Sequence, residues 1–123
     1  MEDFVTFELA KKLKEKGFDC SCIGHYVNNQ LYIAHYLNAF HSDKDESLDA
    51  PTISQVLKWL RKEKKIHIIV EIADSGWYYT LYPNIRWENG KLKSDKYIMS
   101  FKPKVSYEQS ALAGIEYVIN NWI

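Results

Sequence analysis

The chain has 123 residues, and its 16 Lys and Arg balance its 16 Asp and Glu, so the formal net charge is zero. It therefore lacks the net positive charge that is typical of proteins that bind phosphate-rich ligands. Its 46% hydrophobic residues exclude a disordered chain. The length predicts a single globular domain over residues 1–123. No apolar run reaches the roughly 18 residues of a membrane span, and the acidic start Met1–Phe4 does not resemble a signal peptide. We therefore expect a cytoplasmic protein.

The first part of the chain has the patterns of a helix, a hairpin and a loop. An amphipathic helix is predicted from Asp3, which can cap it, to Gly17, where a glycine commonly follows a helix. Residues 20–27 and 30–37 are predicted as strands joined by a turn at Asn28-Asn29, because Asn tolerates positive φ. Residues 38–51 are rich in charged side chains and are predicted as a long polar loop.

The second part alternates between helix and strand patterns. Thr52 and Gln55 have the spacing of a capping box, which starts a helix that ends near Lys64. Strands are predicted at 66–72 and 77–82, with a possible extension of their pairing at 85–87, a turn at 88–90 and a further strand at 97–101.

The last helix is predicted to begin at a second capping box, formed by Ser106 and Gln109, and Gly114 would let its backbone approach a sheet closely. The predicted order is therefore α-ββ-α-ββ(β)-α. This order predicts an α+β fold, in which hairpins form an antiparallel sheet and about three helices pack mainly on one face.

Three stretches carry a resemblance to known sequences: residues 3–18, 50–68 and 106–121. They resemble small uncharacterised proteins of phage, prophage and mobile-element regions in gut anaerobic bacteria. The most specific part is the run A-P-T-x-S-Q-x-x-K-W-L-R at residues 50–61. Such relatives often open their last helix with S-Y-E-E-A, from which Gln109 and Ser110 depart here. The resemblance implies a mobile-element setting and supplies no activity or cofactor.

Metal-ligating and catalytic residue types are present without a recognisable arrangement. Cys20 and Cys22 would share one face of a strand and His25 the other, which is a poor start for a zinc site even with His35 and His41 downstream. The acidic residues 43–49 lack the glycine and the bidentate glutamate of a calcium loop. We therefore predict reduced thiols, no metal and no cofactor.

No nucleophile or phosphate-binding motif is found either, because the glycines are scattered and no G-x-S-x-G, Walker or G-x-G-x-x-G run occurs. A thiolate pair of Cys20 or Cys22 with a histidine, or a base at Glu71, would need further groups that nothing in the sequence marks. The sequence predicts a protein without catalysis of its own, with an enzyme of unrecognised type as the least favoured alternative.

Aromatic residues are abundant, with 4 Trp, 9 Tyr and 5 Phe. Residues 77–82 alternate so that both faces of one strand carry rings, and helices on one face would leave the other exposed. Tyrosine-rich exposed faces are typical of interfaces, so we expect a protein partner or self-association as a homodimer. The alternative is that the rings only form core. The expected interaction surface comprises Trp59, Trp77, Tyr79 and Trp87.

Nucleic-acid binding is the second hypothesis, because basic residues gather at the end of the second helix near aromatic strand residues. A basic helix end also complements the helix dipole without any ligand. The expected phosphate contacts are Lys58, Arg61, Lys62 and Lys65.

Overall fold

The computed structural model describes residues 3–33 and 47–123. The chain divides into two compact units, Met1–Gln55 and Val56–Ile123, which we call unit 1 and unit 2 and describe separately. The single domain over residues 1–123 stays a prediction. Residues 34–37 of the predicted hairpin, both downstream histidines and most of the predicted loop lie outside the described residues.

The described residues of unit 1 form a helix and an antiparallel sheet. The helix is α1 (Phe7–Glu15), and the strands β1 (Gly24–Val27), β2 (Gln30–Ile33) and β3 (Ser47–Ala50) lie in the order β2-β1-β3. The predicted turn is confirmed, since Asn28 and Asn29 have φ of 50° and 69°. The prediction of a loop throughout residues 38–51 is wrong for β3, which pairs with β1 along its length. The charged Asp49 makes this segment resemble a polar loop in the sequence, which is why a strand is not predicted there.

The predicted cap of α1 is also corrected. Thr6 is the N-cap, and its hydroxyl accepts a hydrogen bond from the Leu9 N–H at 3.2 Å. The Asp3 carbonyl instead accepts from the Ile53 N–H at 3.0 Å, and Phe4 forms a β-bridge with Thr52. These pairings hold the chain extended before Thr6, so the helix begins later than the sequence predicts.

The helix α2 (Ile53–Glu63) starts with the capping box that the sequence predicts. The Gln55 N–H donates to Thr52 Oγ1 at 3.2 Å, and Gln55 Oε1 accepts from the Thr52 N–H at 2.9 Å. These reciprocal bonds satisfy backbone donors that a helix start leaves open.

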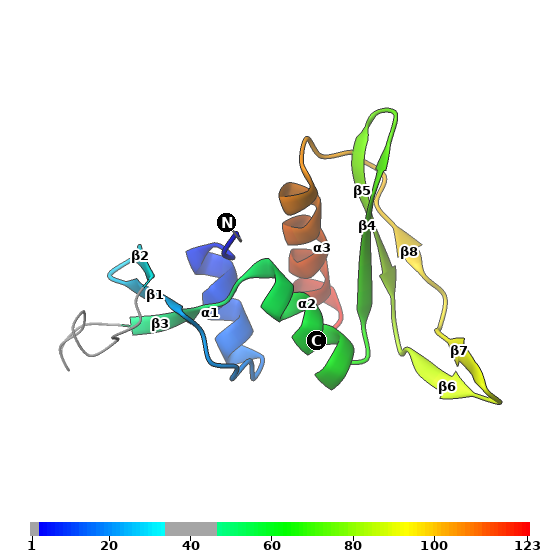
Figure 1. Ribbon diagram of the computed structural model, residues 1–123, viewed down its shortest axis with the longest axis horizontal. Coiled ribbons are helices and arrows are strands. Elements are labelled where there is room, and N and C mark those ends of the chain that lie inside the picture. Colours follow the sequence, from blue (N-terminus) through cyan, green and yellow to red (C-terminus); the bar gives the residue numbers. More distant parts are fainter. Residues whose placement is uncertain (1–2, 34–46) are drawn as a thin grey trace. The chain divides into compact units, whose positions relative to one another are not determined.

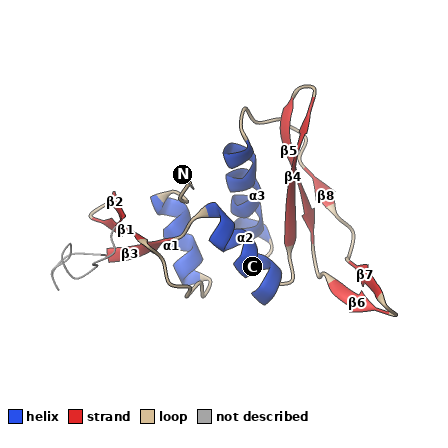
Figure 2. Cartoon of the chain, in the orientation of Figure 1, coloured by secondary structure: helices blue, strands red, loops and turns tan. Residues whose placement is uncertain are grey.

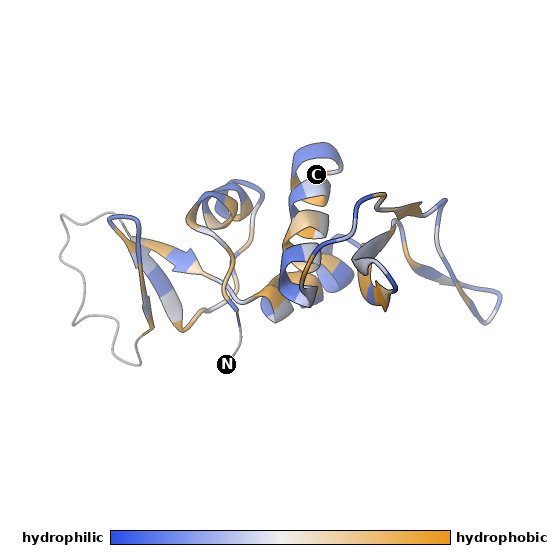
Figure 3. Cartoon of the chain, turned by 90° about the horizontal axis from the view of Figure 1, so that it is seen from above, coloured by the Kyte–Doolittle hydropathy of each residue, from blue (hydrophilic) through white to orange (hydrophobic). Residues whose placement is uncertain are grey.

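Unit 2 is built on a second antiparallel sheet, in the order β4-β5-β8 (Figure 1). Its strands are β4 (His67–Ala73), β5 (Gly76–Tyr82) and β8 (Ile98–Met99), and α3 (Tyr107–Asn121) packs on β4 and β5. Ser106 caps α3 as predicted, with its hydroxyl accepting from the Gln109 N–H at 3.1 Å. Colouring by hydropathy shows that α3 carries both hydrophobic and hydrophilic residues, as a helix with one covered side requires (Figure 3).

A separate hairpin follows β5. The strands β6 (Arg86–Glu88) and β7 (Lys91–Lys93) pair with each other, so the predicted extension of the β4–β5 pairing at 85–87 is wrong (Figure 2). Pro83 and Asn84, whose φ is 51°, end β5 before this point. Asn89 and Gly90, with φ of 54° and 75°, form the predicted turn, because positive φ at both central residues suits a tight hairpin.

The described residues thus form three helices and antiparallel sheets, which confirms the predicted α+β class. The strands are distributed over two three-stranded sheets and one two-stranded hairpin. Among the helices of the described ranges, none combines the length and apolarity needed to cross a bilayer.

Candidate binding surface

The β4–β5–β8 sheet has two different faces. Strand pairing places Ile68 opposite Leu81, and Leu81 opposite Ile98, on the face that α3 covers. A Cβ atom added to Gly114 of α3 would stand 3.2 Å from the Tyr79 ring and 3.3 Å from the Cγ2 atom of Ile68. The glycine therefore lets the helix backbone lie against the sheet, as the sequence predicts.

Two residues of the predicted interaction surface lie on this covered face. The Trp77 ring packs edge-on against Tyr107 of α3, with centroids 5.9 Å apart, and Tyr79 lies under Gly114. Trp77 and Tyr79 are half-buried, as Tyr78 and Tyr82 on the opposite face also are, so the two faces differ in the helix that covers one of them and not in the burial of these rings. The alternation of residues 77–82 predicts two ring-bearing faces, but it does not tell which face a helix covers.

The opposite side of the sheet carries no helix of unit 2 among the described residues (Figure 1). His67 pairs with Tyr82 there, and the Tyr82 and Tyr97 rings lie 5.4 Å apart, which forms a row of rings across the strands. Tyr97 and Met99 are 53% and 54% exposed. We call this surface the open face and define it by six residues: His67, Ile69, Tyr78, Tyr82, Tyr97 and Met99.

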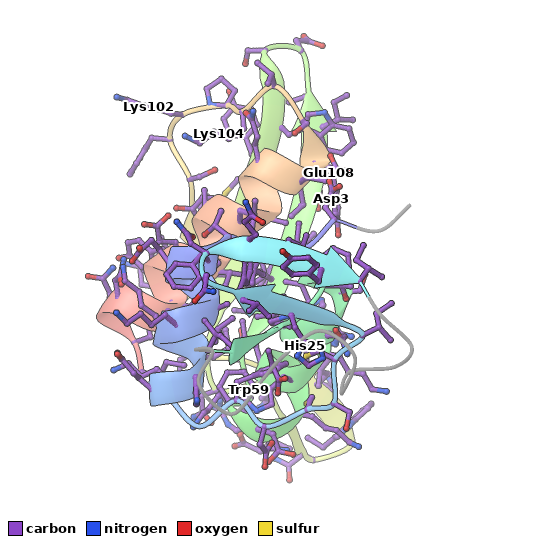
Figure 4. All side chains as sticks on the ribbon, turned by 90° about the vertical axis from the view of Figure 1, so that its left-hand side faces the viewer. Asp3, His25, Trp59, Lys102, Lys104 and Glu108 are labelled. Carbon is purple, nitrogen blue, oxygen red and sulfur yellow. The ribbon has the colours of Figure 1, made fainter. Side chains whose placement is uncertain are left out.

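The chain after β8 leaves this regular pairing. The Ser100 N–H donates to the Tyr79 carbonyl at 2.9 Å, and Lys104 pairs with Trp77 through two backbone bonds. The three residues 77–79 of β5 thus face the five residues 100–104 of the edge segment, so residues 101–103 bulge outward. Phe101 lies in this bulge with 95% of its surface exposed. Lys102 projects away from the ribbon beside it (Figure 4).

A cavity of about 360 Å³ opens between the open face and the β6–β7 hairpin. Its apolar part is formed by isoleucines of the sheet and the loop together with Leu92, and Lys93 and Ser94 supply polar atoms. His67 Nδ1 is buried without a hydrogen-bond partner among the described residues. Burial, and then the positive charge of Arg61, lower the pKa of His67, so its imidazole stays neutral at pH 7. The lining residues are His67, Ile69, Tyr82, Ile85, Leu92, Lys93 and Ser94.

Arg86 and Asp95 anchor the hairpin beside this cavity. The Arg86 guanidinium binds Asp95 Oδ1 at 3.1 Å and the Asn84 carbonyl at 2.9 Å, while its Nε atom binds Glu88 at 3.1 Å. The Asp95 N–H donates to the Pro83 carbonyl at 3.0 Å. These positioning residues were not predicted, because their spacing of nine positions matches no local pattern.

The other predicted surface residues divide into one buried and one exposed tryptophan. Trp59 is only 5% exposed, and the Lys64 ammonium lies 5.4 Å from its ring centroid. Its place in an exposed surface is therefore corrected, because it flanks the apolar stripe of α2 next to Val56. Trp87 is 75% exposed on β6, directly opposite Leu92 of the cavity. Trp87 thus lies beside the open face.

The predicted phosphate contacts are all exposed, from the middle of α2 at Lys58 to Lys65 just beyond its end. Lys58, Arg61 and Lys62 share one side of the helix because they are three and four positions apart. Lys65 follows the helix with φ of 57°, and its ammonium donates to the Lys62 carbonyl at 3.1 Å. Lys65 therefore already satisfies a backbone carbonyl at the C-terminal end of α2.

Among the residues that the structure describes, Cys20, Cys22 and His25 belong to no group that could hold a metal ion, and His35 and His41 lie outside these residues. His25 Nδ1 lies 3.2 Å from Asp49 Oδ1, and the Cys22 thiol donates to the Cys20 carbonyl at 3.3 Å. Burial, with smaller effects of Asp49 and Cys20, raises the pKa of Cys22 to about 12. Cys22 is therefore a thiol at neutral pH, which disfavours a role as a thiolate nucleophile.

Comparison with known proteins gives no match to a family model, a curated protein or a solved structure.

Proposed function

We propose that this chain is a small accessory binding protein without catalysis of its own, which works through the open face and the adjacent β6–β7 hairpin. We propose a phage or mobile-element origin for it, which the resemblance of residues 50–61 to proteins of such regions supports. Its two cysteines are free thiols, which fits a reducing cytoplasm.

One observation carries the proposal: large apolar side chains remain in water on the side of the sheet that α3 does not cover. Tyr97 and Met99 of the open face are 53% and 54% exposed, and Trp87 on β6 and Phe101 in the bulge after β8 are 75% and 95% exposed. Large exposed apolar side chains that gather in one unit are typical of contact sites, because their exposure to water does not stabilise the fold.

The first test measures particle mass by light scattering at micromolar concentration, together with the identity of any co-purifying macromolecule. We expect the wild type to exceed the 14.5 kDa of one chain, through a second copy or a bound partner. The variant Trp87→Ser/Phe101→Ser should return to the mass of one chain. Leu31→Ser, on the exposed strand β2 of unit 1, is the matched control and should behave as wild type.

A wild-type protein that stays at the mass of one chain and brings nothing with it would overturn this proposal. Loss of the larger particle in Leu31→Ser as well would also contradict it, because the contact would then not depend on the open face.

The exposed basic side of α2 supports a second candidate function, binding of nucleic acid through the helix. The triple variant Lys58→Gln/Arg61→Gln/Lys62→Gln should then lose salt-sensitive binding of labelled DNA or RNA. Unchanged binding in that variant would reject the helix as the contact.

A further inference from the structure

The net charge of the whole chain is zero, but the positive and negative residues are distributed unevenly between the two units. Unit 1 contains five Lys and Arg against nine Asp and Glu, whereas unit 2 contains eleven against seven. Unit 2, which holds the open face, is therefore a basic module. The neutrality that weakens a nucleic-acid hypothesis for the whole chain does not apply to this unit.

Several of these basic residues border the open face in the chain. Two lie on β7, one directly precedes Tyr97, and one directly follows Phe101. All four are exposed, and none forms an ion pair with a described residue. Arg86, in contrast, is already held by Glu88 and Asp95. We call the four residues the rim lysines: Lys91, Lys93, Lys96 and Lys102.

The rings and the cavity add what a charged surface alone does not provide. The row that contains Tyr82 and Tyr97 offers flat rings at the surface, and base stacking on such rings tolerates any sequence. The neighbouring cavity of about 360 Å³ is within the range that holds a small planar ligand such as one nucleobase. His67 Nδ1 in its wall is a hydrogen-bonding atom still without a partner in the described chain.

We infer that the open face, together with Phe101 in the bulge after β8, binds single-stranded nucleic acid, with bases stacked on Tyr82, Tyr97 and Phe101 and phosphates on the rim lysines. This inference rests on the proposed function, because it assigns a partner to the same surface. Charge complementarity favours a polyanion over a protein, since lysine is depleted at protein interfaces. Single strands are favoured over duplexes because only unpaired bases present their faces to a sheet.

The test uses purified, nucleic-acid-free protein and fluorescence anisotropy with labelled oligonucleotides of about 12 nucleotides, a length suited to one such surface. Oligo-dT and oligo-U distinguish DNA from RNA, and a duplex of the same length is the comparison. We expect either single strand to bind more tightly than the duplex, with affinity falling steeply as salt rises.

Two sets of variants, each with a control in unit 1, separate the contacts from general effects. Lys93→Gln/Lys96→Gln/Lys102→Gln should lower the slope of log affinity against log salt by about 2, because each lost phosphate contact on a single strand removes about 0.7. Lys11→Gln/Lys14→Gln/Lys16→Gln, on α1 and at its C-cap, changes net charge equally and should leave the slope unchanged. Phe101→Ala and Tyr97→Ala should each weaken binding by about tenfold, whereas Tyr32→Ala in unit 1 should not.

A variant that strengthens binding provides an independent check. Glu71 is an exposed carboxylate of β4 that pairs with Tyr78, and it would repel a phosphate chain on the open face. Glu71→Gln should therefore tighten binding by about threefold. Asp74→Asn in the β4–β5 turn adjusts the net charge by the same amount and serves as the control.

Absence of single-strand binding at low salt, tighter binding of the duplex, or equal losses in the unit 1 variants would overturn the inference. If oligonucleotides do not bind but the larger particle persists and depends on Trp87 and Phe101, the open face binds protein and only this inference fails. If the particle is also absent, the proposed function fails with it.

Discussion

At the scale of single residues, the close approach of α3 to the sheet depends on Gly114. A larger side chain would press on the Tyr79 ring and on Ile68, which a Cβ atom alone would meet at 3.2 and 3.3 Å. Gly114→Val should therefore lower the free energy of unfolding by about 2 kcal/mol, measured by urea denaturation. Glu116→Val, exposed on the same helix, controls for the helix propensity of valine. Equal losses in both variants would show that the contact is unimportant.

The Cys22 thiol provides a second test at this scale. In a Cys20→Ser variant, the raised pKa of Cys22, about 12 instead of 9.0, should make alkylation by iodoacetamide at pH 8 very slow. The rate should still rise about tenfold per pH unit between pH 8 and 10, because the thiolate fraction is far from saturation. In urea the same thiol should react at least about 100-fold faster. Equal folded and unfolded rates would contradict the assigned burial.

The same scale shows what the sequence could and could not predict of the site. The alternation of residues 77–82 correctly separates Trp77 and Tyr79 from Tyr78 and Tyr82. The choice between the two faces depends on where α3 packs, which is a long-range fact that no local pattern contains. The predicted interaction surface therefore contains Trp77 and Tyr79 of the covered face and does not contain Tyr78 and Tyr82 of the open face.

At the scale of elements, the β6–β7 hairpin owes its position to a few polar bonds at its base. Asp95→Ala removes the carboxylate that binds Arg86 and the Asn84 amide at 3.1 and 3.2 Å. Amides of β6 and β7 should then exchange about fivefold faster with deuterium, the equivalent of about 1 kcal/mol, while those of β4 and β5 keep their rates.

The control for this prediction is Asp74→Ala, which removes an exposed carboxylate from the β4–β5 turn. Faster exchange throughout the sheet in Asp95→Ala would mean that Asp95 stabilises all of unit 2 rather than the hairpin.

The existence of the three described helices is predictable because their signals are local, whereas the start of α1 depends on the long-range pairing of Asp3 and Phe4 with residues 52 and 53. The capping residues Thr52 and Ser106 occupy the predicted positions, and both helices begin directly after them. Strands were harder to predict, since β3 has few apolar residues and exists through its pairing with β1. The sequence predicts the turn of the hairpin at 86–93. It does not predict that this hairpin is separate from β5, because the separation follows from the positive φ of Asn84.

At the scale of the whole molecule, the separation of charge predicts behaviour that the isoelectric point near 6.9 does not. At pH 7 the protein should be retained on a cation exchanger despite its zero formal charge, because its basic residues are concentrated in unit 2. The variant Lys93→Gln/Lys96→Gln/Lys102→Gln should elute at lower salt than Lys11→Gln/Lys14→Gln/Lys16→Gln. Both variants have the same net charge, so equal elution would contradict a localised basic surface.

The fully solvated ring of Phe101 also has an evolutionary consequence. A side chain with almost all of its surface in water contributes little to folding, so selection for stability alone would let this position drift freely toward polar residues. If natural variants of this chain keep an aromatic residue at this position, the reason would be selection for binding and not selection for a stable fold.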